Sequence, residues 1–302
     1  MTLRKATRQK AKIRLGLSGP AGSGKTASAL LIAYGLTQDW NKIALIDTEN
    51  NSADLYANHT LESDGRKFTI GEFQVLPLEK PYSPERYIEA IKECEVEGIE
   101  VIIIDSISHE WNGSGGVMEL VDTLKASSNS KNAFTNGWSE ATPRHNKFIE
   151  AMLSSKCHII GCMRSKVDYV LESIEKNGKI IQVPKKVGMA PIQREGVDYE
   201  FTIHFDLNLN HYATAMKDRS GLFASGGFVP SEKTGQNILQ WCESGLDVKA
   251  EVVTAIDKLA KCDSVEDLTL LKETLPIYVI ENADFIKAAK ERYNQVKNLK
   301  TA

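Results

Sequence analysis

Residues 13–26 read IRLGLSGPAGSGKT, and this stretch decides the fold. Its first half is a short apolar run typical of a buried β-strand, and its second half fits the pattern G-x-x-x-x-G-K-[ST]. A helical pattern follows over residues 25–36. Glycines between a strand and a helix let successive backbone N–H groups converge on phosphate oxygens, aided by the helix N-terminus. A chance match would lack these neighbours, so the sequence predicts a phosphate-binding loop.

Each residue type in this loop has its own expected role. Lys25 should reach the β- and γ-phosphates of a nucleotide, and the Thr26 hydroxyl should ligate Mg²⁺. No residue pattern separates ATP from GTP. The predicted nucleotide-binding residues are Gly19, Pro20, Ala21, Gly22, Ser23, Gly24, Lys25, Thr26 and Ala27.

Two further apolar runs end in carboxylates. One run covers residues 99–106 and delivers Asp105, and the other covers residues 42–47 and is followed by Glu49. The carboxyl ends of parallel strands share one edge of a sheet, so both side chains should lie beside the phosphate loop. Asp105 is therefore a candidate Mg²⁺ ligand, with a simple helix cap as the alternative.

The residue after Asp105 is Ser106, although many ATPases place a water-activating glutamate there. Glu49 is the preferred replacement, because it can stand opposite the γ-phosphate and orient or deprotonate water. The alternative is that Asp47 and Glu49 merely cap a turn. Glu110 is the rival base, and we expect it on a loop or helix start beyond the strand.

The first half of the chain alternates short apolar runs with helical patterns up to Met163. Continuous apolar strands separated by helices are typical of α/β proteins with a mostly parallel central sheet covered by helices on both faces. The segment between residues 48 and 72 is turn-rich.

After Met163 the pattern changes. Residues 167–183 contain two β-forming arms around Asn177-Gly178, a strong hairpin signal. Residues 199–207 and 211–217 read as another antiparallel pair, which gives the sheet its antiparallel late strands. From about residue 248 the composition becomes helical.

The C-terminal segment is expected to form a small helical appendage. Ser264 followed by Asp267 resembles a capping box, and apolar spacings from residue 252 onward fit helices that pack on one another or on the core. Docking of a partner is the alternative. We expect three segments: a basic arm at 1–14, a core at 15–246 and the helical segment at 247–302.

Composition restricts the class of protein. The formal net charge of −3 says little about partners, because a basic surface can coexist with a neutral total. The five cysteines are scattered without zinc-ligand spacing, which predicts reduced thiols in a cytosolic protein. No apolar run approaches the roughly 20 residues that a membrane helix needs.

The motifs GPAGSGKT, LIDTE and VIIIDS together resemble the core of RecA-type recombinases and helicases. Over nearly the whole chain the sequence is similar to a phage and prophage group of RecA-like ATPases described as AAA-family nucleotide-binding proteins and related to phage single-strand-annealing recombinases. The resemblance implies a RecA-like P-loop NTPase fold, hydrolysis of ATP with Mg²⁺, Glu49 as the catalytic glutamate, and the cytoplasm of a bacterial host.

The resemblance also assigns residues in the second half. CHIIGCMRSK (157–166) looks like the strand that ends in a polar sensor, which makes Arg164 or Ser165 the candidate. AMKDRSGLF (215–223) is similar to the late strands of DnaB-type cores, where a Lys-x-Arg pair enters the neighbouring subunit's ATP site. Lys217 and Arg219 match that pair, with a solvated turn as the alternative.

Three segments are candidate DNA contacts. The arm carries six cations that could bind phosphates or merely aid solubility: Arg4, Lys5, Arg8, Lys10, Lys12 and Arg14. Residues 124–146 correspond by resemblance to a first DNA loop, where Trp138 could stack on a base or pack on the next helix. Residues 164–195 correspond to a second DNA loop. Its DNA-binding candidates are Lys166, Lys179, Lys185, Lys186 and Arg194.

The sequence therefore predicts a RecA-like ATPase that acts in phage or mobile-element recombination. Single-stranded DNA, a homo-oligomer with ATP at the subunit interface and a single-strand-binding or recombinase partner are the expected partners, with no membrane. The chain lacks an obvious N-terminal polymerisation helix, so ring and filament both stay open. The alternatives are a DnaB-like helicase or translocase and an ATP-switched scaffold with little hydrolysis.

Overall fold

The computed structural model describes residues 6–63, 66–127, 133–176, 179–224 and 226–299. Side chains at 63, 66, 127, 133–136, 167–176, 179–188 and 298–299 lie outside the described set. The chain forms two compact units, residues 12–239 and residues 1–11 together with 240–302. The division falls inside helix α6 (Glu232–Glu243) and not at residue 246. The reason is backbone pairing, since Leu246 N–H donates to Arg8 O and Lys10 N–H donates to Leu246 O.

The larger unit is built on one sheet with the strand order β10–β9–β1–β7–β6–β2–β5, and β8 pairs with β7 alone. The neighbours from β9 to β5 run parallel, whereas β10 is antiparallel to β9 and β8 is antiparallel to β7. The strands are β1 (Arg14–Gly19), β2 (Ile43–Asp47), β5 (Gln74–Pro77), β6 (Val101–Asp105), β7 (His158–Lys176), β8 (Lys179–Pro191), β9 (Ile203–Leu207) and β10 (Ala213–Asp218). This confirms the predicted α/β class with a mostly parallel central sheet and antiparallel late strands.

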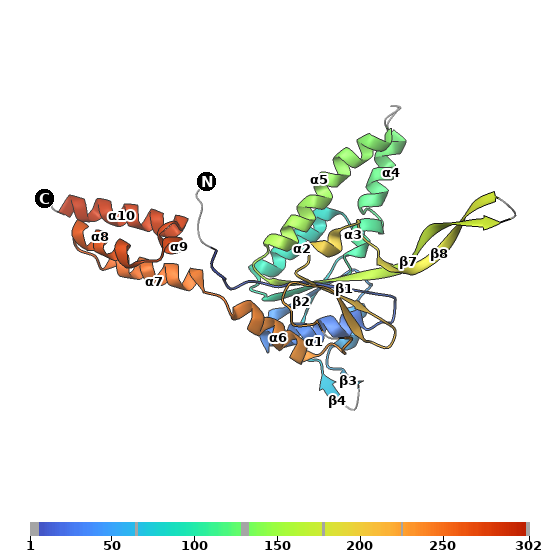
Figure 1. Cartoon of the computed structure of the whole chain (residues 1–302). Helices are drawn as coiled ribbons and strands as arrows, with labels where there is room; N and C mark the ends of the chain where they lie inside the picture. Colours follow the sequence, from blue (N-terminus) through green and yellow to red (C-terminus); the bar gives the residue numbers. More distant parts are fainter. Residues whose placement is uncertain (1–5, 64–65, 128–132, 177–178, 225, 300–302) are drawn as a thin grey trace. The chain divides into compact units, whose positions relative to one another are not determined.

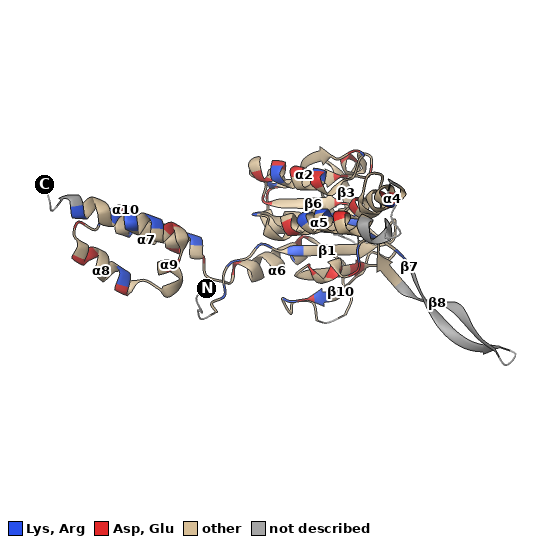
Figure 2. Cartoon of the chain, turned by 90° about the horizontal axis from the view of Figure 1, so that it is seen from above, with Lys and Arg blue, Asp and Glu red and all other residues tan. Residues whose placement is uncertain are grey.

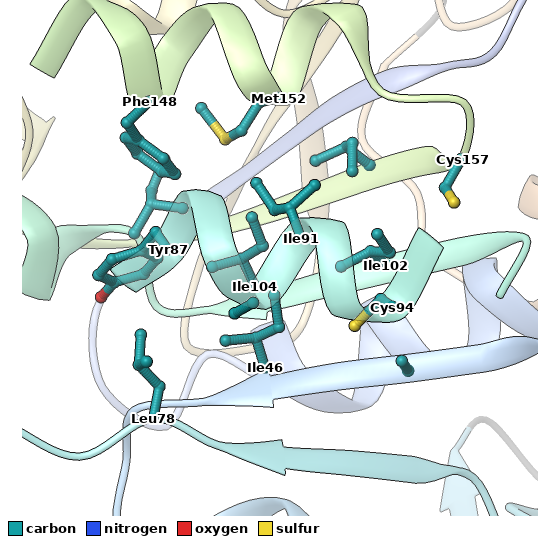
Figure 3. Packing of buried hydrophobic residues seen from close by; sticks show 14 of the residues in the cluster. Ile46, Leu78, Tyr87, Ile91, Cys94, Ile102, Ile104, Phe148, Met152 and Cys157 are labelled. Carbon is teal, nitrogen blue, oxygen red and sulfur yellow. The ribbon is translucent and has the colours of Figure 1, made fainter. Parts of the chain in front are cut away.

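Helices cover both faces of the sheet, with α2 (Pro84–Val96) and α5 (Ala133–Ser154) on one face and α1 (Lys25–Thr37) and α6 on the other (Figure 1). Figure 3 shows Ile46, Ile102 and Ile104 of the sheet beneath side chains of α2 and α5. The intervening Leu45 and Ile103 are also buried. Because strand side chains alternate between faces, the continuous apolar runs follow from this double coverage.

The turn-rich stretch between β2 and β5 does contain regular structure. It holds the 3₁₀ helix η2 (Ser52–Tyr56) and a hairpin of β3 (Thr60–Ser63) and β4 (Arg66–Thr69). Phe68 of this hairpin lies edge-on to Tyr34, which stacks on Trp40 at 4.7 Å. The hairpin is thus attached by aromatic packing, which a turn-rich sequence does not reveal.

The predicted strand at 157–163 and the first hairpin arm form one continuous strand, β7. It pairs with β8 from Ser165↔Pro191 to Lys176↔Lys179, which confirms the two hairpin arms; Asn177 and Gly178 between them lie outside the described residues. Figure 1 shows this two-stranded ribbon extending away from the sheet. Residues 164–176 contain no glycine or proline, the strongest breakers, so the strand continues into the hairpin.

Arg14 corrects the expectation of a fourteen-residue basic arm. It is the first residue of β1, is only 7% exposed, and donates to the carbonyl oxygens of Leu153, Ser155 and Cys157. These carbonyls lie at the C-terminal end of α5, where a cation complements the helix dipole. Arg14 is therefore part of the core. Arg4 and Lys5 lie outside the described residues.

The smaller unit contains α7 (Val248–Ala260), α8 (Val265–Thr274), α9 (Ile277–Ile280) and α10 (Ala283–Leu299) around their own apolar cluster. The predicted capping box is confirmed, since Ser264 and Asp267 exchange side-chain to backbone hydrogen bonds at 3.0 Å. All five cysteines of the chain are buried free thiols. None of the helices in the described residues is long and apolar enough to span a membrane.

Candidate nucleotide site

The phosphate loop spans the turn from Gly19, where β1 ends, to Lys25, where α1 begins. Gly22 and Gly24 have φ of 79° and 80°, a left-handed conformation that glycine adopts without steric cost. The N–H groups of the first helical turn have no intrahelical acceptor and are available to an anion. Lys25 donates from Nζ to the carbonyl oxygens of Gly19 and Pro20 at 3.0 and 2.9 Å.

Thr26 and Asp105 meet at the foot of this loop. The Thr26 hydroxyl donates to Asp105 Oδ2 at 2.5 Å, whereas the buried Oδ1 atom has no hydrogen-bond partner among the described residues. A buried carboxylate oxygen without a donor is unfavourable unless a cation compensates it. Hydroxyl and carboxylate oxygens are ligands that Mg²⁺ accepts together with phosphate and water. The pair therefore fits the predicted Mg²⁺ site.

Asp105 has a perturbed acidity. Burial raises the pKa of its carboxyl to about 6, a hydrogen bond from Thr26 opposes the rise, and the nearby charge of Glu49 adds to it. Lys25 lowers the same pKa by a smaller amount. A divalent cation at this carboxylate would favour its ionised form, so metal binding and loss of the proton are linked.

Glu49 and Asp47 have different roles at the tip of β2. Asp47 accepts hydrogen bonds from Glu49 N at 2.6 Å and Ala53 N at 3.0 Å, which is the turn cap considered above. The Glu49 carboxylate instead pairs with Arg164 Nε at 2.9 Å. Glu49 is therefore held by a cation at the open edge of the site and is not used as a turn cap.

Thr48 ties the tip of β2 to the tip of β6. Its N–H donates to Asp105 O at 2.9 Å, and its Oγ1 accepts from Ser106 N at 2.7 Å and lies 2.7 Å from His109 Nδ1. Asp47 and Asp105 are directly opposite each other in the register of the two strands. These contacts fix the backbone of Glu49 relative to Asp105.

Of the two sensor candidates, Arg164 is the one that contacts the site. It lies opposite Gly19 in the pairing of β7 with β1, and its N–H donates to Ser108 Oγ at 3.0 Å. The hydroxyl of Ser165 is buried and forms no hydrogen bond within the described part of the chain. Arg164 thus links the phosphate-loop edge to the base of the β7–β8 hairpin.

The rival base, Glu110, is enclosed elsewhere. It lies in α3 (Ser108–Asn112), is fully buried, and contacts His145 Nδ1 at 3.0 Å and Gln193 Nε2 at 3.2 Å. Burial raises the pKa of Glu110, and the His145 hydrogen bond opposes this rise. Its partners come from α5 and the segment after β8, so it has no contact with the phosphate loop.

Two residues at the loop carry no signal in a sequence motif. His211 lies in the turn between β9 and β10, and its Nδ1 is 2.7 Å from the position that a Cβ on Gly24 would occupy. Tyr56 of η2 is hydrogen-bonded to Thr26; burial and then the charge of Asp105 raise its pKa. Both side chains therefore border the predicted phosphate and metal positions.

Lys217 and Arg219 lie apart from this site within the chain. Strand β10 runs antiparallel to β9, so Asp218 pairs with Ile203 at the edge opposite the phosphate loop. Lys217 donates to the Tyr199 carbonyl, and burial lowers its pKa. The Arg219 side chain is exposed. Any action of this pair on ATP would have to concern another subunit.

The DNA-binding candidates have different surroundings. Trp138 lies within α5, is half-buried in a small cluster with Val117 and Val121, and lies 5.9 Å from the Trp111 ring; it therefore packs, but on preceding helices and not on the next one. Lys166 is exposed on β7. Arg194 donates to Asn146 Oδ1 at 3.3 Å. The side chains of Lys179, Lys185 and Lys186 on β8 lie outside the described residues.

Comparison with known proteins gives one family and a number of similar solved structures. No curated protein matches the chain. A solved structure described as "Crystal structure of the RadB recombinase" is similar with 15% identity and a TM-score of 0.37, covering 76% of this chain and 90% of that one. Those values carry no argument about function. Residues 11–245, more than half of the chain, match the family described as "AAA domain", and the chain therefore belongs to this family of P-loop nucleotide-binding proteins.

Proposed function

We propose that this protein is a Mg²⁺-dependent, RecA-type ATPase that acts on single-stranded DNA in phage or mobile-element recombination, in the cytoplasm of a bacterial host. The observation that carries the ATPase part is the convergence of three strand ends. The phosphate loop follows β1, Asp105 ends β6, and Glu49 follows β2 at the same edge of the sheet. The Thr48 contacts support a fixed spacing between the two carboxylate-bearing ends.

In this proposal the residues of the loop bind the triphosphate. Lys25 exchanges its two carbonyl acceptors for phosphate oxygens, and the N–H groups at the start of α1 bind the same anion. Thr26 and Asp105 would hold Mg²⁺, which neutralises charge on the β- and γ-phosphates when bound. The buried, unpartnered Oδ1 of Asp105 supports this assignment.

Glu49 orients a water molecule and accepts its proton. Its carboxylate is only partly exposed and is kept at the site by Arg164 Nε, so one contact supports the position of the base. Arg164 is also the first candidate for sensing the γ-phosphate, since it lies beside Gly19 at the loop edge.

DNA binding is proposed at the β7–β8 hairpin. The ribbon continues the central strand of the sheet, and exposed Lys166 lies near its base. Candidate contacts farther along β8 are Lys179, Lys185 and Lys186. Phosphate contacts by lysine and arginine give affinity that falls steeply with salt. The salt dependence of DNA binding is therefore the expected property of this surface.

A second copy of the chain is proposed at the β10 edge of the sheet. Within the described residues, the outer side of this edge strand pairs only through the isolated bridge between Ala213 and Phe228. Apolar side chains around it are accessible, with Tyr199 69% and Met216 65% exposed. Large exposed apolar side chains at a sheet edge favour association. Lys217 and Arg219 lie at this edge and would enter the neighbour's ATP site.

Replacing Glu49 tests the proposal. Glu49→Gln keeps the side-chain shape but removes the base, so we expect nucleotide binding to persist and DNA-stimulated ATP hydrolysis to fall by about 10²–10⁴-fold. Binding is measured with a fluorescent ATP analogue and turnover by phosphate release. Glu97→Gln, at an exposed glutamate after α2, is the matched control. Normal turnover in Glu49→Gln would refute the catalytic assignment, and negligible turnover in the unmodified chain would favour the scaffold.

Action across subunits has its own test. Arg219→Ala should bind ATP normally and lose turnover, because the finger is missing from the neighbour's site. Lys25→Ala should lose its own ATP site but retain Arg219. Mixing the two inactive variants should restore part of the activity through hybrid interfaces. Wild-type turnover by Arg219→Ala alone, or no recovery on mixing, would contradict this part of the proposal.

A further inference from the structure

The helical unit formed by α7–α10 contains a groove that its own side chains leave open. Leu259, Leu268 and Phe285 form the floor and belong to the buried cluster of the unit. The groove has a volume of about 670 Å³. It lies between α8 and α10, outside the parts of the chain that carry the proposed ATPase site. Grooves of this size are typical of ligand or peptide sites.

The two walls follow helical spacing. On α8 the lining positions are Val265, Leu268, Thr269 and Lys272, which repeat as i, i+3, i+4 and i+7. Helix α10 contributes Ile286 and Tyr293, seven residues apart. Residues at these spacings share one face of a helix. Each helix therefore presents one row of side chains to the groove.

The walls keep apolar side chains in contact with solvent. Ile286 is 39% and Tyr293 43% exposed, although both line a concave surface beside buried Phe285. Apolar surface of this kind favours an apolar occupant. An amphipathic helix that enters such a groove uses anchors at i, i+3, i+4 and i+7, the spacing already present on α8.

The charged residues that line the groove all have the same sign. Acidic and basic residues both occur along the helices of this unit (Figure 2). Glu266 and Glu273 belong to α8, and Glu291 belongs to α10. The charged residues that line the groove, however, are Lys272 and Lys290. Neither lysine forms an ion pair within the described part of the chain. The groove is thus apolar with a positive rim.

We propose that this groove binds an amphipathic helical segment of a partner protein, with apolar anchors on the floor and carboxylates on Lys272 and Lys290. A nucleic acid fits less well, because backbone recognition needs a track of cations and most of this lining is apolar. The proposal does not depend on the ATPase assignment, since all of its residues lie between 259 and 294.

A peptide-binding experiment on the full chain tests the groove. The probe is a fluorescent helix-forming peptide of about four turns with Leu at i, i+3, i+4 and i+7 and Glu and Ala elsewhere. A Lys-for-Glu version and a scrambled version of the acidic peptide serve as comparison probes. We expect anisotropy to show binding of the acidic amphipathic peptide and at least about tenfold weaker binding of both others.

Charge reversal locates the contact. Lys272→Glu with Lys290→Glu should weaken binding by about tenfold or more, and Tyr293→Ala should weaken it through the apolar wall. Lys258→Glu with Lys287→Glu is the matched control, since it also changes one last-turn lysine and one α10 lysine but neither lines the groove. Circular dichroism checks folding, and ATP binding should be unchanged in every variant.

Three outcomes would overturn the proposal. These are failure of the acidic peptide to bind, equal binding by the scrambled peptide, and equal loss in the matched control. Displacement of the peptide by single-stranded DNA, with the same lysine dependence, would show that the groove is a nucleic-acid site. None of these results depends on Glu49, so a failed ATPase assignment and a failed groove assignment remain distinguishable.

Discussion

The carboxyl group of Asp105 is buried, which disfavours its ionised form unless a cation is bound, and yet it is held at a fixed position. Its carboxyl is buried beside Thr26 and close to the charge of Glu49, so the ionised form is disfavoured and its pKa rises to about 6. The contacts of Thr48 nevertheless hold the backbone of Asp105 in place at the sheet edge, and Thr26 donates to its carboxylate. A group that is unfavourable for stability but held in position is typical of a functional site.

Asp105→Asn should therefore stabilise the nucleotide-free protein at neutral pH. The folded-state pKa lies above the ordinary 3.8, so wild-type stability declines as pH rises from there through about 6. The resulting difference in unfolding free energy between the Asn variant and the wild type is about 3 kcal/mol at pH 7.5, and almost nothing below pH 4. Urea denaturation of both proteins at the two pH values measures it. A gain that is independent of pH would contradict the assignment.

The raised pKa of Asp105 should also make the binding of Mg²⁺-nucleotide depend on pH. Because Mg²⁺ needs the ionised carboxylate, the affinity for Mg²⁺-nucleotide should fall as pH drops through about 6 in the wild type. Binding without metal should change less. The Asn variant should lose this pH dependence together with its hydrolysis, which a binding titration with and without Mg²⁺ distinguishes.

At the scale of elements, the crossing of α6 with the C-terminal half of α1 shows how closely two helices can approach. A Cβ on Gly35 would lie 2.1 Å from Glu232 O, and one on Gly235 would lie 2.1 Å from Ile32 O. Both obstacles are backbone atoms, which cannot turn aside. The two glycines therefore permit a contact distance that no other residue type allows.

Gly235→Ala should destabilise the larger unit by about 1–3 kcal/mol, because the added methyl group forces the helices apart. Gly227→Ala is the control, since its Cβ would meet its nearest neighbour, Ala213 O, at 3.5 Å. Thermal or urea unfolding measures both. Equal stability of the two variants would show that α6 can move away without loss.

Among the elements, the sequence predicted those whose signals are local. The loop glycines, the apolar runs of β1, β2 and β6, and the Ser264–Asp267 capping box all act over a few residues, and the structure contains each of them. The register that sets Asp47 beside Asp105 follows from parallel pairing, so the convergence of their strand ends was also predictable.

Non-local contacts were not predictable in the same way. The burial of Arg14 depends on carbonyl groups about 140 residues later in the chain. Arg164 meets Glu49 only because β7 inserts between β1 and β6. His211 lies in a turn and Tyr56 in the 3₁₀ helix η2, and neither segment contains a motif. Contacts between distant parts of the chain determine all of these positions, and such contacts cannot be read from a single sequence.

At the scale of the molecule, the division into two units separates the proposed chemistry from the helical groove. Residues 12–239 contain every residue of the proposed ATPase site, and residues 240–302 join residues 1–11 in the other unit. The backbone bonds between the arm and residues 242–246 make the N-terminal segment part of that second unit. Removal of the helices α7–α10 should therefore abolish peptide binding and leave nucleotide binding intact.

A chain that ends at residue 246 should bind nucleotide with unchanged affinity. It retains the phosphate loop and the backbone partners of the arm, and it lacks the helices α7–α10. Titration with a fluorescent ATP analogue measures the affinity, and binding of the acidic peptide should disappear in the same protein. Loss of nucleotide binding with intact far-UV circular dichroism would show that the helices are needed at the site.

Strand β7 has a mechanical consequence, because its first part is an inner strand of the sheet and its second part is one strand of the projecting β7–β8 ribbon. Its inner stretch is flanked by β1 and β6 through direct hydrogen bonding. A force on the far end of the ribbon would be transmitted along β7 to the region of Arg164, where the strand enters the sheet. Twisting the ribbon would shear the phosphate-loop strand against the Asp105 strand, and the register shift between Asp168 and Tyr169 is the place where part of that load would be absorbed.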